Sequence, residues 1–170
     1  MQTPRNRLKG GVYKNMIEQI CVKLFKDNYI TCYIENGKVL ASGYTTKLTR
    51  ENYSSSFSKN VKKKIEDYSL GKKVDLQKIS IKIPGQDFGK KVFSSVKKIP
   101  RGQTLTYKEV AIKSGKPFGA RAVGNIMGKN SLPLFIPCHR VVSQTGLGGF
   151  MKGKKGGLEI KQTLLDLEQK

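Results

Sequence analysis

The sequence predicts an α+β protein in which a small N-terminal domain of antiparallel strands plus a helix precedes a mostly helical C-terminal domain with a helix-turn-helix. Three observations predict this class. Runs rich in β-forming residues fill residues 18–45, apolar residues recur at helical spacing after residue 85, and Pro84-Gly85 interrupts the pattern between them. The expected divisions are a flexible basic arm over residues 1–15, an α/β domain over residues 16–84 and a helical domain over residues 85–170.

The N-terminal domain begins with two predicted strands, Ile20–Phe25 and Tyr29–Ile34. The residues Glu35-Asn36-Gly37-Lys38 are typical of a tight turn and lead into a third strand, Val39–Tyr44. Apolar residues at helical spacing then predict a helix with one buried face, formed by Tyr53, Phe57, Val61, Ile65 and Tyr68. Finally Ile79, Ile81 and Ile83 alternate with polar residues, which predicts one more half-buried strand.

The C-terminal domain shows four further helix signals. Asp87 is expected to cap a helix whose apolar face is Phe88, Val92, Val96 and Ile99. Thr106 and Glu109 fit a capping box, so a second helix begins after Thr106 and stops near Ser114-Gly115. A third runs from about Gly119 to Gly128, and two short helices joined by a glycine-containing turn fit a helix-turn-helix. The last helix carries Leu158, Ile160, Leu164, Leu165 and Leu167, after a glycine- and lysine-rich loop over residues 146–157.

The chain is strongly basic, with 33 Lys and Arg against 12 acidic residues and a formal charge of +21. Both halves of the chain carry more than twice as many basic as acidic residues, so a basic tail alone does not account for the charge. Such a surface attracts phosphate polyanions in a salt-dependent way, although it also fits a merely solubilising surface.

Cysteine usage and hydropathy indicate in which cellular compartment the protein works and whether it binds a metal or a cofactor. Three cysteines without dense spacing favour a reducing compartment, and one histidine without a CxxC pair argues against a zinc site, so we expect neither metal nor cofactor. No apolar run reaches membrane-spanning length and no signal peptide is visible, which predicts a cytoplasmic protein, or a nuclear one in a eukaryote. Residues 1–15 are a basic arm, an extension ahead of a natural start at Met16, or a short targeting peptide.

The motif Pro137-Cys138-His139-Arg140-Val141 is the most informative part of the chain. A thiolate is the reactive form of cysteine, and a neighbouring base or positive charge lowers its pKa. His139 is therefore a candidate proton acceptor for Cys138, directly or through water. The alternatives are that Cys138 is a small buried hydrophobe and His139 a core histidine. Cys21 and Cys32, inside apolar strands, fit that plainer interpretation.

The predicted second helix of the helix-turn-helix carries a single arginine, Arg121, between small residues that include Ala120 and Gly124. Such a face has little to read base edges with, but it approaches a backbone or a shallow groove closely. This pattern predicts sequence-independent DNA binding with one inserted side chain. The plainer alternative is an ordinary surface arginine.

The stretch Thr106–Val142, with the motifs ARAVG and IPCHRVV, closely resembles the O6-alkylguanine-DNA alkyltransferase family. The resemblance continues at Gly148-Gly149-Phe150, at Gly156-Gly157-Leu158 and at Leu164-Leu165-x-x-Glu168, and it covers about the last 85 residues. It implies a ribonuclease H-like N-terminal domain, and a DNA repair protein that moves the alkyl group of O6-alkylguanine onto its own cysteine in a single turnover. It also implies a monomer that binds duplex DNA from the minor groove and flips the damaged nucleotide.

The resemblance implies a role for each matching residue. Cys138 matches the acceptor thiol, His139 the residue that activates it through water, and Glu168 the carboxylate that orients the histidine. Asn130 matches the hinge asparagine, and Tyr107 the tyrosine that contacts the flipped nucleotide's phosphate and donates a proton toward guanine. Arg121 matches the finger that fills the vacated place in the base stack. Backbone contacts are implied for Lys108, Lys116 and Gln144, and positions around the guanine pocket for Pro133, Phe150 and Met151.

The chain departs from the family pattern at two places. Asn130 is followed by Ser131 rather than by proline, and the segment 151–155 is longer than the usual link and adds lysines. Two other hypotheses stay open on the residues alone. The first is a lesion-sensing DNA-binding protein that transfers nothing, and the second is a Cys-His hydrolase with multiple turnovers.

Overall fold

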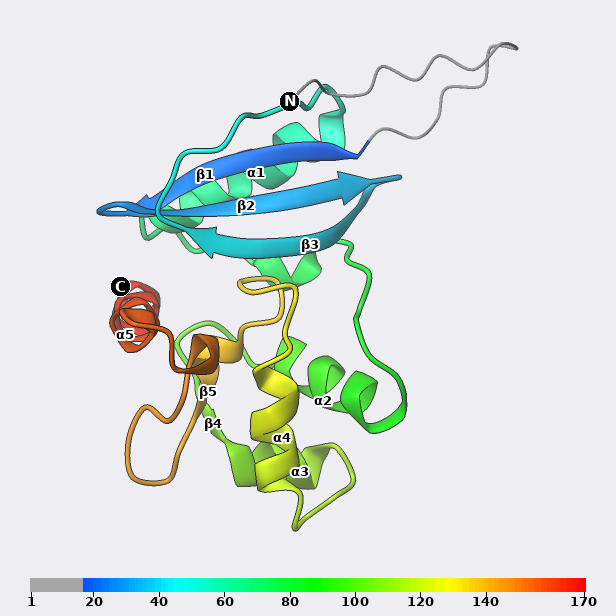
Figure 1. The fold of residues 1–170 in the computed structure, drawn as a ribbon, viewed down its shortest axis with the longest axis vertical. Helices are drawn as coiled ribbons and strands as arrows, with labels where there is room; N and C mark the ends of the chain where they lie inside the picture. The colour runs from blue at the N-terminus through cyan, green and yellow to red at the C-terminus, as the bar shows by residue number, and fades with distance from the viewer. Residues whose placement is uncertain (1–16) are drawn as a thin grey trace.

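A computed structural model of the chain describes residues 17–170. The predicted basic arm over residues 1–15 and the alternative start at Met16 lie outside the described residues. The described part is a mixed α/β structure with a three-stranded antiparallel sheet and five α-helices (Figure 1). None of its helices combines the length and the hydropathy of a membrane span.

The sheet consists of β1 (Glu18–Phe25), β2 (Asn28–Glu35) and β3 (Lys38–Thr45), in that spatial order. The turn between β2 and β3 is tight because Asn36 and Gly37 adopt positive φ angles of 50° and 68°. The helix α1 (Ser56–Ser69) covers one face of the sheet, and its buried side chains include Val61, Ile65 and Tyr68. The three predicted strands and this helix are confirmed, except that Tyr53 precedes the helix.

The predicted strand over residues 79–83 does not form. A short 3-10 turn, η1 (Leu76–Lys78), comes first, and only Ile81 makes an isolated bridge, to Val39 of β3. The edge of β3 is shared between two segments: Val39 accepts from the Lys82 amide at 3.0 Å, whereas the Ser42 amide donates to the Ser131 carbonyl at 2.8 Å. A longer strand over residues 79–83 would need the part of this edge that the segment after Asn130 occupies.

The C-terminal part begins with α2 (Asp87–Lys97). The prediction that Asp87 caps this helix is wrong, because Gln86 occupies the N-cap position without a side-chain hydrogen bond. Asp87 is instead the first helical residue, one position later than a capping residue, and has a φ angle of 43°.

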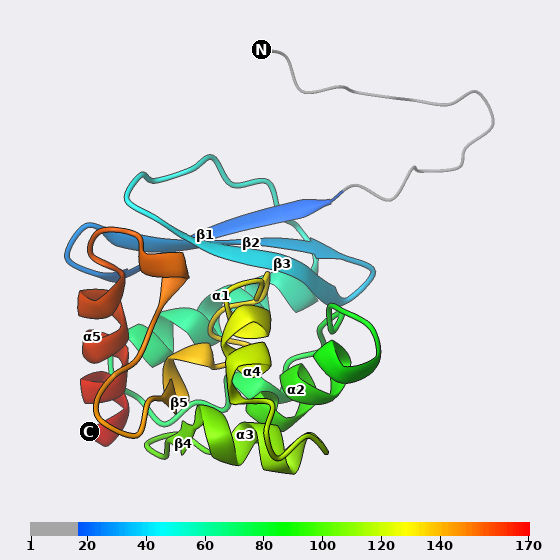
Figure 2. The same ribbon diagram turned by 60° about the horizontal axis from the view of Figure 1, so that its bottom comes forward.

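The remaining elements follow the predicted order (Figures 1 and 2). They are β4 (Leu105–Thr106), α3 (Tyr107–Lys113), α4 (Ala120–Met127), η2 (Cys138–Arg140), β5 (Val141–Val142), η3 (Met151–Gly153) and α5 (Gly157–Gln169). The capping box is confirmed: the Glu109 amide donates to Thr106 Oγ1 at 3.2 Å, and the Thr106 amide donates to Glu109 Oε2 at 2.6 Å. One cluster of buried apolar residues joins the sheet side to the helical side.

Candidate active site

Cys138 is the first residue of η2 and follows directly after a buried apolar segment. The strand β5 begins directly after η2, at Val141. The turn is closed by the Cys138 amide, which donates to the Ile136 carbonyl at 2.7 Å, and by the Arg140 amide, which donates to the Pro137 carbonyl at 2.9 Å. Side chains in this turn do not alternate as in a strand. Cys138 stays partly accessible, whereas His139 and Arg140 are buried.

The carboxylate of Glu168 on α5 forms hydrogen bonds with two side chains of this turn, His139 and Arg140, and with Tyr68. His139 Nε2 lies 2.9 Å from Glu168 Oε1. Arg140 forms a two-pronged contact, with Nε 2.8 Å from Oε2 and Nη2 2.7 Å from Oε1. Tyr68 of α1 donates its hydroxyl to Oε1 at 2.6 Å. A carboxylate with this many donors is held in one orientation, and it holds the imidazole in turn.

The charges in this network follow from burial and from these contacts. Burial alone would raise the pKa of Glu168, but hydrogen bonds from His139 and Arg140 lower it well below its ordinary value. Burial lowers the pKa of His139, although Glu168 opposes this shift. Glu168 is therefore ionised at neutral pH and His139 is neutral, so the imidazole is able to accept a proton. Its Nδ1 atom has no hydrogen-bond partner among the described residues.

Two further side chains act on the thiol and its loop. Asn130 donates from Nδ2 to the Ile136 carbonyl at 2.9 Å and accepts the Leu132 amide at 3.0 Å, so it ties the end of α4 to the segment before Cys138. Burial raises the pKa of the Cys138 thiol, and the Asn130 side chain and the charge of Lys161 oppose that rise.

Lys161 is a buried amine that holds three backbone carbonyls. Its Nζ donates to Val141 at 2.6 Å, to Leu147 at 2.5 Å and to Gly149 at 3.3 Å. Burial lowers its pKa to about 8, and Cys138 opposes that shift. Lys161 therefore joins α5 to both sides of the loop that follows Cys138.

Tyr107 reaches the same loop because β4 and β5 pair in parallel. Leu105 lies opposite Val141 and Thr106 opposite Val142, which places the start of α3 beside the turn of Cys138. The Tyr107 hydroxyl donates to the Gly149 carbonyl at 3.2 Å. Gly148 has a φ angle of +69°, and a Cβ built there would lie 2.9 Å from the Tyr107 ring, so this close approach requires glycine.

The residues predicted to touch DNA lie mostly on the outside of the α3–α4 region. Arg121, Lys108, Lys116 and Gln144 are exposed, and Ala120 and Gly124 are half-buried. The Lys116 amine lies 4.7 Å from the centre of the Phe88 ring. The structure thus leaves Arg121 free to reach outward, and it keeps small residues around it.

The three residues predicted for the guanine pocket are placed differently from one another. Pro133 is buried and its carbonyl accepts the Ser42 hydroxyl at 2.9 Å. Phe150 is buried, and its ring centre lies 6.0 Å from that of Tyr44 on β3. Met151 is half-buried and lines a groove of about 420 Å³ that also includes Tyr44 but not Cys138.

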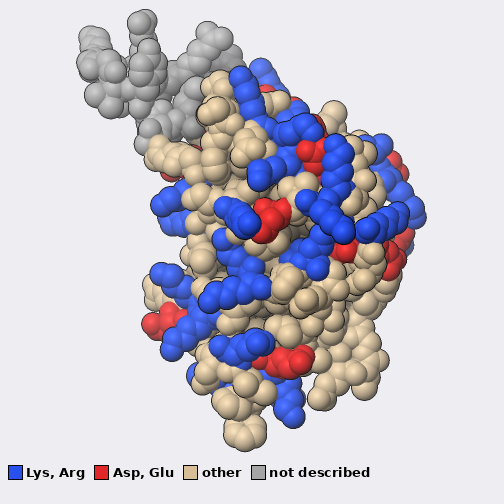
Figure 3. Space-filling model, turned by 180° about the vertical axis from the view of Figure 1, so that it is seen from behind, with Lys and Arg blue, Asp and Glu red and all other residues tan. Residues whose placement is uncertain are grey.

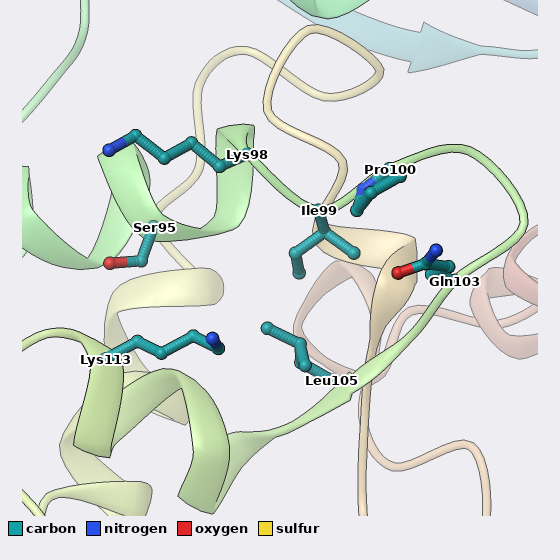
Figure 4. A pocket seen from close by; sticks show the side chains of 7 residues that line it. All are labelled: Ser95, Lys98, Ile99, Pro100, Gln103, Leu105 and Lys113. Carbon is teal, nitrogen blue, oxygen red and sulfur yellow. The ribbon is translucent and has the colours of Figure 1, made fainter.

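A second groove lies away from the predicted chemistry, between the end of α2, the segment that leads into β4, and the end of α3 (Figure 4). Its volume is about 330 Å³, its walls carry Lys98 and Lys113, and Ile99 and Leu105 contribute apolar surface. It contains none of the residues that the sequence predicted for catalysis.

Sequence reasoning missed three members of the site: Arg140, Lys161 and Tyr68. Arg140 stands inside the quoted motif, but nothing in the local pattern shows that an arginine next to a histidine is buried. Lys161 occupies a helix rich in charged residues, where a solvent-exposed lysine is the usual expectation. Tyr68 was predicted only as part of an apolar helix face.

Comparisons with known proteins agree with this architecture. A family model described as "6-O-methylguanine DNA methyltransferase, DNA binding domain" matches residues 87–170. The methylated-DNA–protein-cysteine methyltransferase of Metallosphaera sedula is 41% identical over 106 residues, which are 62% of this chain and 64% of that protein. The relative from Methanosarcina barkeri is 40% identical over 115 residues, which are 66% of this chain and 69% of that protein.

A solved structure extends the likeness to the N-terminal sheet. The crystal structure of Mycobacterium tuberculosis O6-methylguanine methyltransferase is 26% identical, covers 91% of this chain and 93% of its own, and has a TM-score of 0.73. The structure of Mycobacterium tuberculosis OGT in complex with DNA covers 83% and 86%, at 29% identity and a TM-score of 0.69. The chain belongs to the methylated-DNA–protein-cysteine methyltransferase family.

Proposed function

We propose that this chain repairs DNA by transferring the alkyl group of O6-alkylguanine in duplex DNA to the sulfur of its own Cys138. The observation that carries the proposal is the partly accessible Cys138 thiol next to a buried His139 that Glu168 holds at 2.9 Å. Family membership supports it, because the relatives carry the name methylated-DNA–protein-cysteine methyltransferase.

The chemistry balances without a cofactor. His139, acting through water from its free Nδ1, accepts the thiol proton, and the thiolate attacks the alkyl carbon. The bond from that carbon to guanine O6 breaks as the carbon–sulfur bond forms, and the electron pair stays on guanine. Guanine then gains one proton, which Tyr107 donates, and the proton that His139 took from the thiol passes through water to restore the Tyr107 hydroxyl. The thioether that remains on Cys138 is stable, and each molecule acts once.

Access to the lesion requires DNA docking and base flipping. The O6 atom lies inside the duplex, so a thiolate reaches it only after the nucleotide leaves the stack, at a cost of a few kcal/mol. In this proposal α3 and α4 act as the helix-turn-helix, α4 enters the minor groove without reading sequence, and Arg121 fills the vacated place. Lys108, Lys116 and Gln144 contact the backbone, and one molecule acts as a monomer.

The charge distribution supports the attraction to DNA. Lys and Arg are spread over the face opposite to that of Figure 1, and the acidic residues on that face lie interspersed among them (Figure 3). A charge of +21 that is not confined to one element draws the protein to phosphate from many directions.

The test is the intact mass of the protein after incubation with a duplex that contains one O6-methylguanine. We expect every active molecule to gain the mass of one methyl group in place of a hydrogen, and Cys138→Ser to gain nothing while still binding the duplex. A lesion-sensing protein would bind and keep its mass. A Cys-His hydrolase would keep its mass and turn over an ester repeatedly, and either result would contradict the proposal.

A further inference from the structure

The turn between α3 and α4 carries a phenylalanine, Phe118, whose ring is not buried in the core. Phe118 is fully exposed, at 103% of its reference area, whereas the next most exposed large apolar side chain among the described residues is Leu70 at 72%. The turn projects at the end of the molecule in both ribbon views (Figures 1 and 2). Burying a phenylalanine side chain typically stabilises a protein by about 1.5–3 kcal/mol, and this fold leaves that gain unused.

The backbone around Phe118 is held in place on both sides. The Lys116 amide donates to the Ala111 carbonyl at 2.9 Å, and the Gly119 amide donates to the Lys116 carbonyl at 2.8 Å. A Cβ on Gly119 would lie 3.0 Å from the Lys116 carbonyl, so the turn is also tightly packed. The ring therefore projects from a fixed turn.

Phe118 is close in sequence to the residues proposed to meet DNA. Arg121 follows three residues later in the first turn of α4 and is exposed, and Ala120 between them is small. Lys116, on the other side of Phe118, places its amine above the Phe88 ring, 4.7 Å from its centre. Along the chain, the exposed Phe118 thus lies between two cations that the proposed function places on DNA, Lys116 and Arg121.

We propose that Phe118 is an apolar DNA contact that packs against the duplex beside the point where Arg121 enters. The inference rests on the proposed docking of α4 onto DNA and adds a second inserted side chain to it. Apolar side chains, phenylalanine among them, wedge against base steps in proteins that deform DNA from the minor groove. Phe118 holds α4 against the duplex while the damaged nucleotide is out of the stack.

Salt dependence separates this contact from an ionic one. Each phosphate that a cation neutralises contributes about 0.9 to the slope of log K against log salt, whereas an apolar contact contributes nothing to it. We expect Phe118→Ala to weaken binding to an unmodified duplex about tenfold at every salt concentration with the slope unchanged. Lys116→Ala should lower the slope, and Leu70→Ala should change neither quantity. Equal affinity of Phe118→Ala and the parent protein would overturn the proposal.

A direct readout is available because the chain contains no tryptophan. In Phe118→Trp the introduced indole is the sole one, so its emission should be quenched saturably as duplex is added, with binding retained. The matched control is Leu70→Trp, whose emission should not respond to duplex. Emission of Phe118→Trp that ignores duplex, or that changes with protein concentration alone because two copies associate, would overturn the proposal.

These measurements use unmodified duplex and do not depend on methyl transfer. If the parent protein binds DNA but transfers no methyl group, the proposed function fails while the Phe118 contact is still decided by the indole emission. If transfer occurs and the indole does not respond, only the contact fails.

Discussion

Replacing Arg140 with methionine tests the buried ion pair that organises the site. Arg140 is 1% exposed. Its guanidinium donates hydrogen bonds to both carboxylate oxygens of Glu168 and, through Nη1, to the Ile99 carbonyl at 2.6 Å. The substitution keeps most of the side-chain volume but leaves a buried carboxylate without its cation. Breaking a buried pair in this way costs about 3–5 kcal/mol, a large share of the about 5–15 kcal/mol that holds a typical domain folded.

The assay is urea unfolding followed by circular dichroism, with Lys26→Met as the control. Lys26 pairs with Glu159 at 3.2 Å, but the two side chains are 78% and 69% exposed, so that pair is worth less than about 1 kcal/mol. In a Glu168→Gln background the cost of Arg140→Met should shrink, because no buried charge is left alone. Equal losses from Arg140→Met and Lys26→Met would refute the buried-pair account.

Two further outcomes follow from the site. Gly148→Ala should slow alkyl transfer by about ten- to a hundredfold, because the added Cβ displaces the Tyr107 ring. Gly146→Ala should not slow it, because a Cβ built at Gly146 meets no heavy atom within 4 Å. Equal transfer rates of the two variants in single-turnover assays would contradict this. Acid should destabilise the protein in two stages seen by urea unfolding. The lowered pKa of His139 removes stability as pH falls below the unfolded value of about 6.5, and the lowered pKa of Glu168 removes more below about 4.3. A free energy of unfolding that stays constant from pH 7 to pH 4 would contradict it.

The elements that the sequence predicted correctly are those set by local chemistry. The turn at Asn36-Gly37 needs positive φ angles, and the box of Thr106 and Glu109 needs only four residues. The parallel pair of β4 and β5 was not predicted, because two residues in each strand leave no periodicity to detect. The strand over residues 79–83 was predicted wrongly, since its alternation says nothing about which segment occupies the edge of β3.

The contacts of the site also fall into those that the sequence predicted and those that only the structure shows. The contact between His139 and Glu168 was expected from the resemblance, and the geometry has it. The roles of Tyr68 and Lys161 depend on contacts between residues far apart in the chain: Tyr68 meets Glu168 across a separation of 100 residues, and Lys161 closes on carbonyls 12 to 20 residues away. Only the folded chain brings such groups together, so their burial has no signature in composition or spacing.

Peptide mapping after exposure to an excess of O6-methylguanine duplex shows where the methyl group goes. We expect one methyl group per chain, all of it on the peptide that contains Cys138, with no increase when more duplex is added. Methyl groups on Cys21 or Cys32, or an unmodified Cys138 peptide, would contradict it.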